Sequence, residues 1–246
     1  MLVRRVPFSR GWRWIVEAFG LFRRSPMIWI ILSLLLLLIA LGLNLIPVIG
    51  EYIMYLLTPL FIAGMMTACR DLEAGKAIEV GHLFRGFREN TTQLVTVGGI
   101  YLVGQVVIVG VVLSVGGAEL QDALRAAADG HPEQITIEAA NRVSLAVLVG
   151  SALFVPLAMA VWFAPSLVAL DDVLAFRAQQ TSMRACLANL LPFLCYSIIM
   201  SGLLLIAVTP LFAGLLLWMP LAVISTYTSY KDVFVRATDE DVIRPG

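Results

Sequence analysis

Three aspartates occupy matching places in the chain and are the polar residues best placed to do chemistry. Asp71, Asp172 and Asp232 each follow the apolar part of a segment that we expect to cross a membrane. Carboxylates at one level could gather around a shared axis. The alternative is local, in which each carboxylate caps the next helix or pairs with a neighbouring cation such as Arg70 or Lys231. We favour the local interpretation, which gives these carboxylates no catalytic role.

The other titratable and nucleophilic residues form no recognisable site. Cys69, Cys186 and Cys195 lack the spacing of metal ligands, and an odd number of cysteines gives no disulfide framework. His82 and His131 are expected on opposite sides of the membrane. No charged residue falls at the middle of an apolar stretch, where ion-coupled carriers usually keep one. We therefore expect no enzyme activity, no metal and no cofactor.

The elements that must position these residues follow from composition. The 246 residues are 60% apolar and only 14% charged, against roughly 25% charged residues in soluble domains. The mean hydropathy is +0.90. Charge-free stretches long enough for a membrane helix, which needs about 20 residues, run over 27–45, 52–69, 94–115 and 143–170. The stretch 185–230 is also charge-free and must hold two more spans, with a turn near Thr209-Pro210 because proline breaks the helical ladder.

The basic residues are strongly biased to one side of these six spans. Of the 17 Lys and Arg residues, only Arg125 and Arg142 fall outside the N-terminal arm, the segments after the second and fourth spans, and the tail. Basic loops stay in the cytoplasm during insertion. We therefore expect an inner-membrane protein with both termini cytoplasmic and an extracytoplasmic loop over 117–141. That loop should be helical from Glu119 to Ala128, where Ala, Leu and Gln dominate.

The chain is thus expected to be one all-α integral membrane domain over 1–246, built from three hairpins that are each preceded by a short amphipathic helix. The parts are an interfacial helix at 8–24, hairpin 1 at 27–72, an interfacial helix at 76–90, hairpin 2 at 91–173, a cytoplasmic helix at 174–189, hairpin 3 at 190–233 and a tail at 234–246.

Self-similarity between the hairpins indicates a repeat. The stretch from Pro59 to Leu72 aligns without gaps with the stretch from Pro220 to Val233, with proline, leucine, threonine and aspartate in step. We infer three copies of one unit, in which an interfacial helix and an outward span precede an inward span that ends in aspartate.

The inward spans carry helix-breaking residues. These are Pro59, Pro156, Pro165 and Pro220. Proline inside a membrane helix frees a backbone carbonyl that neighbours must satisfy. Broken helices at corresponding positions of a repeat can mark a transport site. They can equally be kinks that allow the hairpins to pack.

The first amphipathic helix has the composition of a lipid-interface segment. Its aromatic residues and arginines are Arg10, Trp12, Arg13, Trp14, Phe19, Phe22, Arg23 and Arg24. Aromatic anchors with arginines on the other face suit a helix in the headgroup layer, where the arginines would meet lipid phosphates. The alternative is an elbow that only sets the entry angle of the first span.

Four motifs carry a resemblance to a known family. They are Gly11-Trp-Arg-Trp-Ile15, Leu21-Phe-Arg-Arg-Ser-Pro26, Ala185-Cys-Leu-Ala-Asn-Leu-Leu-Pro-Phe193 and Tyr227-Thr-Ser-Tyr-Lys-Asp232. With them, nearly the whole chain resembles a family of bacterial six-helix inner-membrane proteins. It is similar, more distantly, to the membrane domain attached to some bacterial glycerophosphodiesterases. The resemblance implies six helices in the inner membrane, and it implies no reaction and no catalytic residues.

The sequence favours a non-enzymatic membrane protein that binds lipid or scaffolds a partner through its cytoplasmic helices. The expected partners are membrane lipids, anionic ones in particular, or a protein, and no nucleic acid. The alternative is a small-solute permease with its path among the second, fourth and sixth spans. A continuous polar cavity reaching the middle of the membrane would favour the permease.

Overall fold

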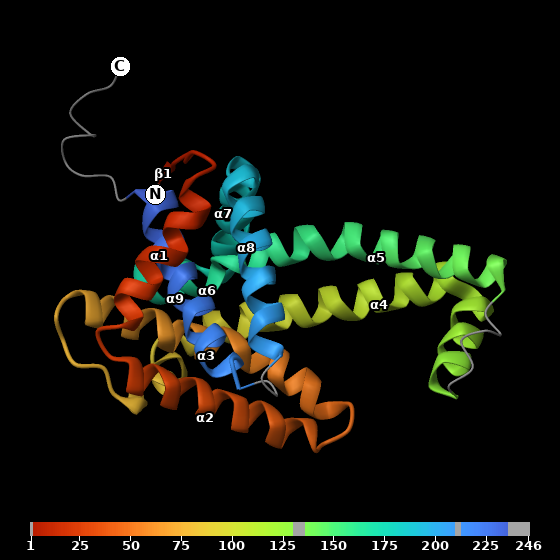
Figure 1. The fold of residues 1–246 in the computed structure, drawn as a ribbon, viewed down its shortest axis with the longest axis horizontal. Coiled ribbons are helices and arrows are strands. Elements are labelled where there is room, and N and C mark those ends of the chain that lie inside the picture. The colour runs from red at the N-terminus through yellow and green to blue at the C-terminus, as the bar shows by residue number, and fades with distance from the viewer. Residues whose placement is uncertain (1, 130–135, 210–212, 236–246) are drawn as a thin grey trace.

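Helices make up nearly all of the structure, a computed structural model that describes residues 2–129, 136–209 and 213–235 (Figure 1). The all-α expectation is confirmed. The α-helices are α1 (Arg10–Phe22), α2 (Pro26–Asn44), α3 (Ile49–Glu73), α4 (Thr91–Ala128), α5 (Ile137–Trp162), α6 (Ala164–Asp171), α7 (Ala175–Ala188), α8 (Leu190–Val208) and α9 (Leu215–Val233). A 3-10 helix, η1 (Val80–Phe87), and two short strands, β1 (Leu2–Val3) and β2 (Phe234–Val235), complete the described elements.

Five helical segments in the described part of the chain are long and apolar enough to cross a membrane. They are Pro26–Asn44, Ile49–Glu73, Thr91–Ala126, Ile137–Asp171 and Leu190–Val208. The sixth expected span is also helical, as α9. Its second half carries hydroxyl residues and Lys231, which lower its hydropathy. The structure therefore supports five spans, and a sixth remains a prediction.

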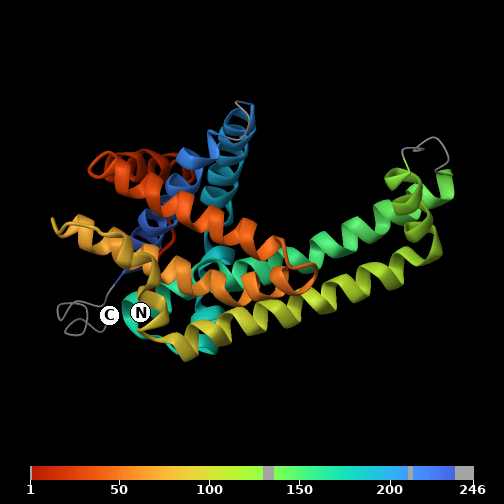
Figure 2. The same cartoon turned by 90° about the horizontal axis from the view of Figure 1, so that it is seen from below.

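Three helical hairpins fan out from a common base (Figures 1 and 2). They are α2–α3, α4–α5 and α8–α9, and α4–α5 extends furthest. The joined ends of α8 and α9 point to the top of Figure 2, whereas the tips of the other two hairpins point to the right. The short elements α1, η1, α6 and α7 gather where the hairpins converge. Short helices precede each of the three hairpins in the chain, and the expected threefold repeat stays a prediction.

Local chain geometry agrees with several expected boundaries. The helix expected at 174–189 is α7, and the one expected at 76–90 is the shorter η1. The predicted helix from Glu119 to Ala128 is present as the continuation of α4. A kink at Gly117 separates the two parts, because its φ of 60° is a left-handed conformation that glycine tolerates.

The prediction of broken inward spans is correct at one proline and wrong at three. Pro165 lies in the first turn of α6, which follows the end of α5 at Trp162. Pro59, Pro156 and Pro220 lie inside the continuous helices α3, α5 and α9. A proline removes only one N–H, and packing against neighbouring helices can keep the turn intact. The expected turn at Pro210 and the tail beyond 235 lie outside the described residues.

The core lies at the base of the hairpins rather than along them. Its largest fully buried side chains include Trp14, Trp29 and Phe163. The N-terminal segment is fixed there by the antiparallel pairing of β1 with β2. The side chain of Asn189 also holds it, because its amide donates to the Arg4 carbonyl (3.0 Å) and its oxygen accepts from the Val6 N–H (2.8 Å). The start of the chain and the end of α9 therefore lie on the same side of the molecule.

Candidate functional site

Helix α1 has two apolar faces, one buried and one exposed. Its buried face packs on α8 and α9. Its side chains at this face are Trp14, Ile15, Ala18, Leu21 and Phe22. Gly11 allows this close approach, because a Cβ there would lie 2.3 Å from the Pro192 carbonyl oxygen. The expectation that Trp14 and Phe22 enter the lipid interface is therefore wrong. The apolar side chains of α1 occupy a wide arc, so that some of them pack into the protein core and others face outward.

The exposed face of α1 carries a row of large apolar side chains. Phe8, Trp12, Val16 and Phe19 follow one another at helical spacing and are each about half exposed, at 55%, 53%, 49% and 52%. Phe8 precedes the helix, and the other three lie on it. We call this row the α1 outer row. It includes Trp12 and Phe19, two of the residues expected at the lipid interface.

The four arginines expected at the lipid interface, two in α1 and two directly after it, divide into two kinds. Arg10 is committed to the protein, because it pairs with Asp232 and lies 3.2 Å from the Glu17 carboxylate. Burial lowers the pKa of Arg10, but the hydrogen bond and charge of Asp232, with help from Glu17, outweigh it and raise the pKa overall.

The other three, Arg13, Arg23 and Arg24, are exposed. Among the described residues, Arg13 and Arg23 have no ion-pair partner, although Arg23 lies 5.9 Å from the Phe19 ring centre. Arg13 and Arg23 are therefore available to external phosphates.

A charged pocket of about 490 Å³ lies beside α1, at the ends of α3 and α9. Its charged lining residues are Arg10, Glu17, Arg24, Glu73, Lys231 and Asp232. Lys231 forms an ion pair with Glu73, and Tyr227 donates a hydrogen bond to the same carboxylate at 2.9 Å. Three cations face three anions and most are already paired, so an anion would have to displace an existing partner to bind here.

The first of the three expected carboxylates, Asp71, is the acceptor of a buried polar cluster. It accepts from Arg85 at 2.6 Å, His82 at 3.2 Å and Lys76 at 3.4 Å. Its exposed fraction is only 7%. Arg85 and His82 belong to η1, so this cluster fixes η1 against the end of α3. The expected pairing of Asp71 with Arg70 is not observed.

The other two carboxylates have different surroundings. Asp232 accepts from Arg10 and from the Trp14 indole N–H (2.9 Å), so it ties α9 to α1. Asp172 is exposed, has a φ of 53° and accepts from the Asn90 amide at 2.7 Å. Asp71 and Asp232 thus share one role, because each ties the end of a hairpin to the short helix that precedes another hairpin. Asp71 ties α3 to η1, which precedes α4–α5. Asp232 ties α9 to α1, which precedes α2–α3.

Neither interpretation of the three carboxylates from the sequence is correct in detail. Each has its own partners, so the three are not one site, and none caps the following helix. Glu79 caps η1 instead. In the described part of the chain no group of three or more His, Cys, Asp or Glu residues could hold a metal ion. These carboxylates act as local ties within the base.

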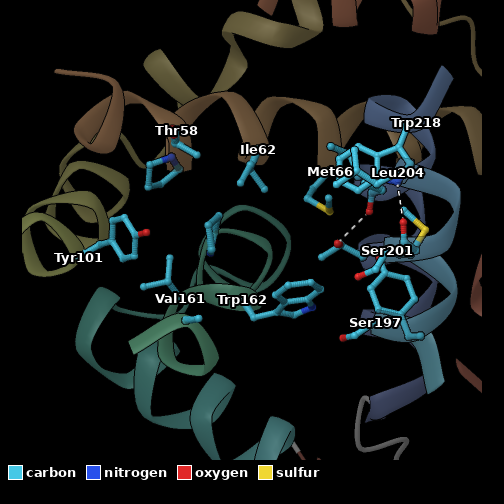
Figure 3. A pocket seen from close by; sticks show the side chains of 18 of the residues that line it. Thr58, Ile62, Met66, Tyr101, Val161, Trp162, Ser197, Ser201, Leu204 and Trp218 are labelled. Carbon is cyan, nitrogen blue, oxygen red and sulfur yellow. Dashed lines mark hydrogen bonds between the residues drawn. The ribbon is translucent and has the colours of Figure 1, made fainter. Parts of the chain in front are cut away.

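A cavity of about 560 Å³ lies between the diverging hairpins (Figure 3). Its walls come from α3, α4, α5, α8 and α9, with Pro165 of α6 at its edge. Thr58 and Ile62 point into it from α3, and Val161 and Trp162 from α5. The helices that carry Pro59, Pro165 and Pro220 thus border one cavity, although only Pro165 lies at a break between two helices.

The lining of this cavity is apolar and contains no charged side chain. Its hydroxyl and indole groups are largely bonded within the protein. Thr58 donates to the Met54 carbonyl (2.7 Å), and Thr226 donates to the Ala222 carbonyl (3.0 Å). The Trp218 indole donates to the Met200 carbonyl at 3.0 Å. The cavity therefore offers little to a polar or charged ligand.

Part of this site was visible in the sequence and part was not. Tyr196, Ser197 and Ser201 are recognisable as deep polar residues of a membrane stretch, and all three line the cavity. Trp162 and Trp218 carry no such signal, because they reach the cavity only through the way α5 and α9 are placed around it.

The chain is similar to a protein of Burkholderia thailandensis named "Probable inner membrane protein BTH_II0599". The two are 33% identical over 211 residues, which cover 83% of this chain and 77% of that protein. No family model matches the chain, and no solved structure matches it. These comparisons show no link to glycerophosphodiesterases. With five helices able to cross a membrane, the relative's name supports a multi-pass inner-membrane location. This chain therefore belongs to the family of bacterial inner-membrane proteins that includes the Burkholderia protein.

Proposed function

We propose that this protein is a non-enzymatic inner-membrane protein that binds anionic lipid of the cytoplasmic leaflet through the outer face of α1. The observation that carries the proposal is the α1 outer row, which exposes Trp12 and Phe19 beside two unpaired arginines, Arg13 and Arg23. Aromatic side chains favour the membrane interface, and arginines there meet lipid phosphates.

The charge distribution supports the orientation that this function needs. Outside the segment 117–142, the described Lys and Arg residues belong to the N-terminal arm, to α1, η1 and α7, to the ends of α3 and α9, or to segments directly after these elements. These elements lie where the hairpins converge (Figure 1). Basic segments stay in the cytoplasm, so we infer that the base and both chain ends are cytoplasmic. Helix α1 would then lie at the depth of the cytoplasmic headgroups.

The expected effect is lipid selection rather than attachment, since the spanning helices already anchor the chain. Each basic residue near an anionic leaflet contributes roughly 1 kcal/mol. Two such residues correspond to a preference of up to about thirtyfold for anionic over zwitterionic lipid.

The test is the double variant Arg13→Gln/Arg23→Gln, with Arg125→Gln/Arg142→Gln as a control that removes the same charge far from α1. Each protein is purified in mild detergent, and the bound lipids are quantified by mass spectrometry. The α1 variant should lose most of its excess of phosphatidylglycerol and cardiolipin over phosphatidylethanolamine, and the control should keep it. An unchanged lipid ratio in the α1 variant would contradict the proposal and leave α1 as a structural elbow.

Two alternatives use the same structure. A scaffold would use the α1 outer row to dock a protein, and the row's position beside arginines at the headgroup depth favours lipid over a protein. A permease would use the cavity among the proline-bearing helices. Its apolar, uncharged lining gives that alternative less support.

A further inference from the structure

We propose that the cavity between the hairpins holds a hydrocarbon chain of a bilayer lipid, which enters sideways between α5 and α8. This site is separate from the α1 outer row, so the test of one does not decide the other.

The opening of the cavity points to bilayer lipid as the source of its occupant. Trp162 at the end of α5 is 37% exposed, and Ser197 and Ser201 of α8 are also exposed. All three line the cavity, and both helices belong to segments able to cross a membrane. Helix α5 packs on α4 and α7, and α8 packs on α1 and α9. The two helices meet where the Trp162 ring contacts the rings of Phe193 and Tyr196 of α8. The gap therefore lies beyond Trp162, where Ala158 of α5 and Ser201 of α8 line the cavity. In a membrane, a gap between two spanning helices faces lipid.

The lining decides between hydrocarbon, water and a polar solute. A water molecule in a buried site needs two to four polar partners, and apolar cavities stay dry. Here Thr58, Thr226 and Trp218 already bond to backbone carbonyls of the protein. The hydroxyls of Ser197 and Ser201 lie on the exposed side of α8, at the opening rather than in the interior. A charged solute would lose its hydration without a charged partner in the lining. Hydrocarbon has no such cost.

The size and shape of the space also fit a chain. A volume of about 560 Å³ lies within the range of ligand pockets, about 300–1,000 Å³. A smaller cavity of about 160 Å³ adjoins it between α5, α7 and α8, and the two share Ala158, Trp162 and Ser197. Together they form a groove on both sides of the Trp162 side chain.

Packing, rather than the hydrophobic effect, would hold the chain in place. Lipid tails are as apolar as the lining, so moving a tail from the bilayer into the cavity gains no hydrophobic free energy. An empty cavity forfeits the dispersion contacts of every side chain around it. A chain from the adjacent leaflet restores these contacts.

The test uses the full-length protein in vesicles that contain phosphatidylethanolamine with a diazirine near the end of one chain. Illumination should label Ile62 and Val161, whose side chains point into the cavity (Figure 3). Ala158→Phe fills the space from α5, and labelling at Ile62 should fall roughly tenfold, which corresponds to about 1.4 kcal/mol. Ala152→Phe makes the same change at an exposed position of α5 and should leave labelling unchanged.

A second variant and a second probe keep the result decisive. Ala222→Phe fills the cavity from α9, should Ala158→Phe prevent folding. Absence of label at Ile62 and Val161 in the native protein, or labelling unaffected by a folded filling variant, would overturn the proposal. So would rapid reaction of Ser201→Cys with a charged, membrane-impermeant thiol reagent in a Cys195→Ser background, because it would reveal a water-filled path.

Discussion

The Asp71 cluster gives the sharpest stability prediction. The backbone N–H of Glu79 donates to His82 Nδ1 at 3.0 Å, which leaves the Nε2–H of His82 to donate to Asp71 at 3.2 Å. His82 is 6% exposed, so water cannot readily replace this acceptor. Asp71→Asn removes the negative charge and can turn an amide N–H toward donors that now lack an acceptor.

The magnitude follows from the exposure of each partner. A buried donor without an acceptor costs about 1–3 kcal/mol. The side chains of Arg85 and Lys76 are 36% and 68% exposed and can regain water. The loss should therefore stay below the 3–5 kcal/mol typical of a broken, fully buried ion pair. We expect Asp71→Asn to lower the free energy of unfolding by about 2 kcal/mol.

The matched control is Asp172→Asn, the same change at a corresponding helix end. Asp172 is exposed at a φ of 53°, which asparagine tolerates, so its cost should be under about 0.5 kcal/mol. Unfolding of both variants is measured by denaturant titration in detergent micelles, followed by tryptophan fluorescence. Equal stability of the two variants would refute the assignment of Asp71 as the centre of a buried cluster.

Two further predictions test the packing of α1 and α7. Gly11→Val should destabilise the protein far more than Gly20→Val, because a Cβ at Gly11 meets the Pro192 carbonyl oxygen at 2.3 Å, while no atom lies near Gly20; comparable melting temperatures would contradict this close approach. Burial raises the pKa of the Cys186 thiol to about 12, so at pH 8 only about one molecule in ten thousand carries the reactive thiolate. Maleimide labelling of Cys186, followed by peptide mass spectrometry, should be slow in the native protein and fast after unfolding, and fast labelling in the native protein would contradict its burial.

Hydropathy and charge predict the helices of the hairpins well, because a helix that crosses the hydrocarbon core must be apolar and free of charge over its whole length. The ends of α2, α3 and α8 lie close to the ends of their apolar stretches. The extent of α9 follows from the same reasoning, although its hydroxyl-rich half and Lys231 make it less apolar than the five segments able to cross a membrane. Hydropathy and charge patterns depend only on residues that are close in the chain, so a single sequence is enough to read them.

Contacts between distant segments are absent from these patterns. Arg10 and Asp232 are 222 residues apart, and Trp14 is buried against α9 although it alternates with exposed Trp12. Asp71 meets His82 and Arg85, 11 and 14 residues later in the chain, across a turn whose path no periodicity specifies. The cavity depends on the angles between hairpins, which side-chain packing at the base determines.

Native mass spectrometry of the full-length protein released from lipid nanodiscs tests the central claim most directly. The nanodiscs would contain equal amounts of phosphatidylglycerol and phosphatidylethanolamine. The account predicts that the protein retains phospholipid, with phosphatidylglycerol in excess, and that Arg13→Gln/Arg23→Gln loses this excess. A protein released without lipid, or with the two lipids in equal proportion, would contradict the proposal that this is a lipid-binding membrane protein.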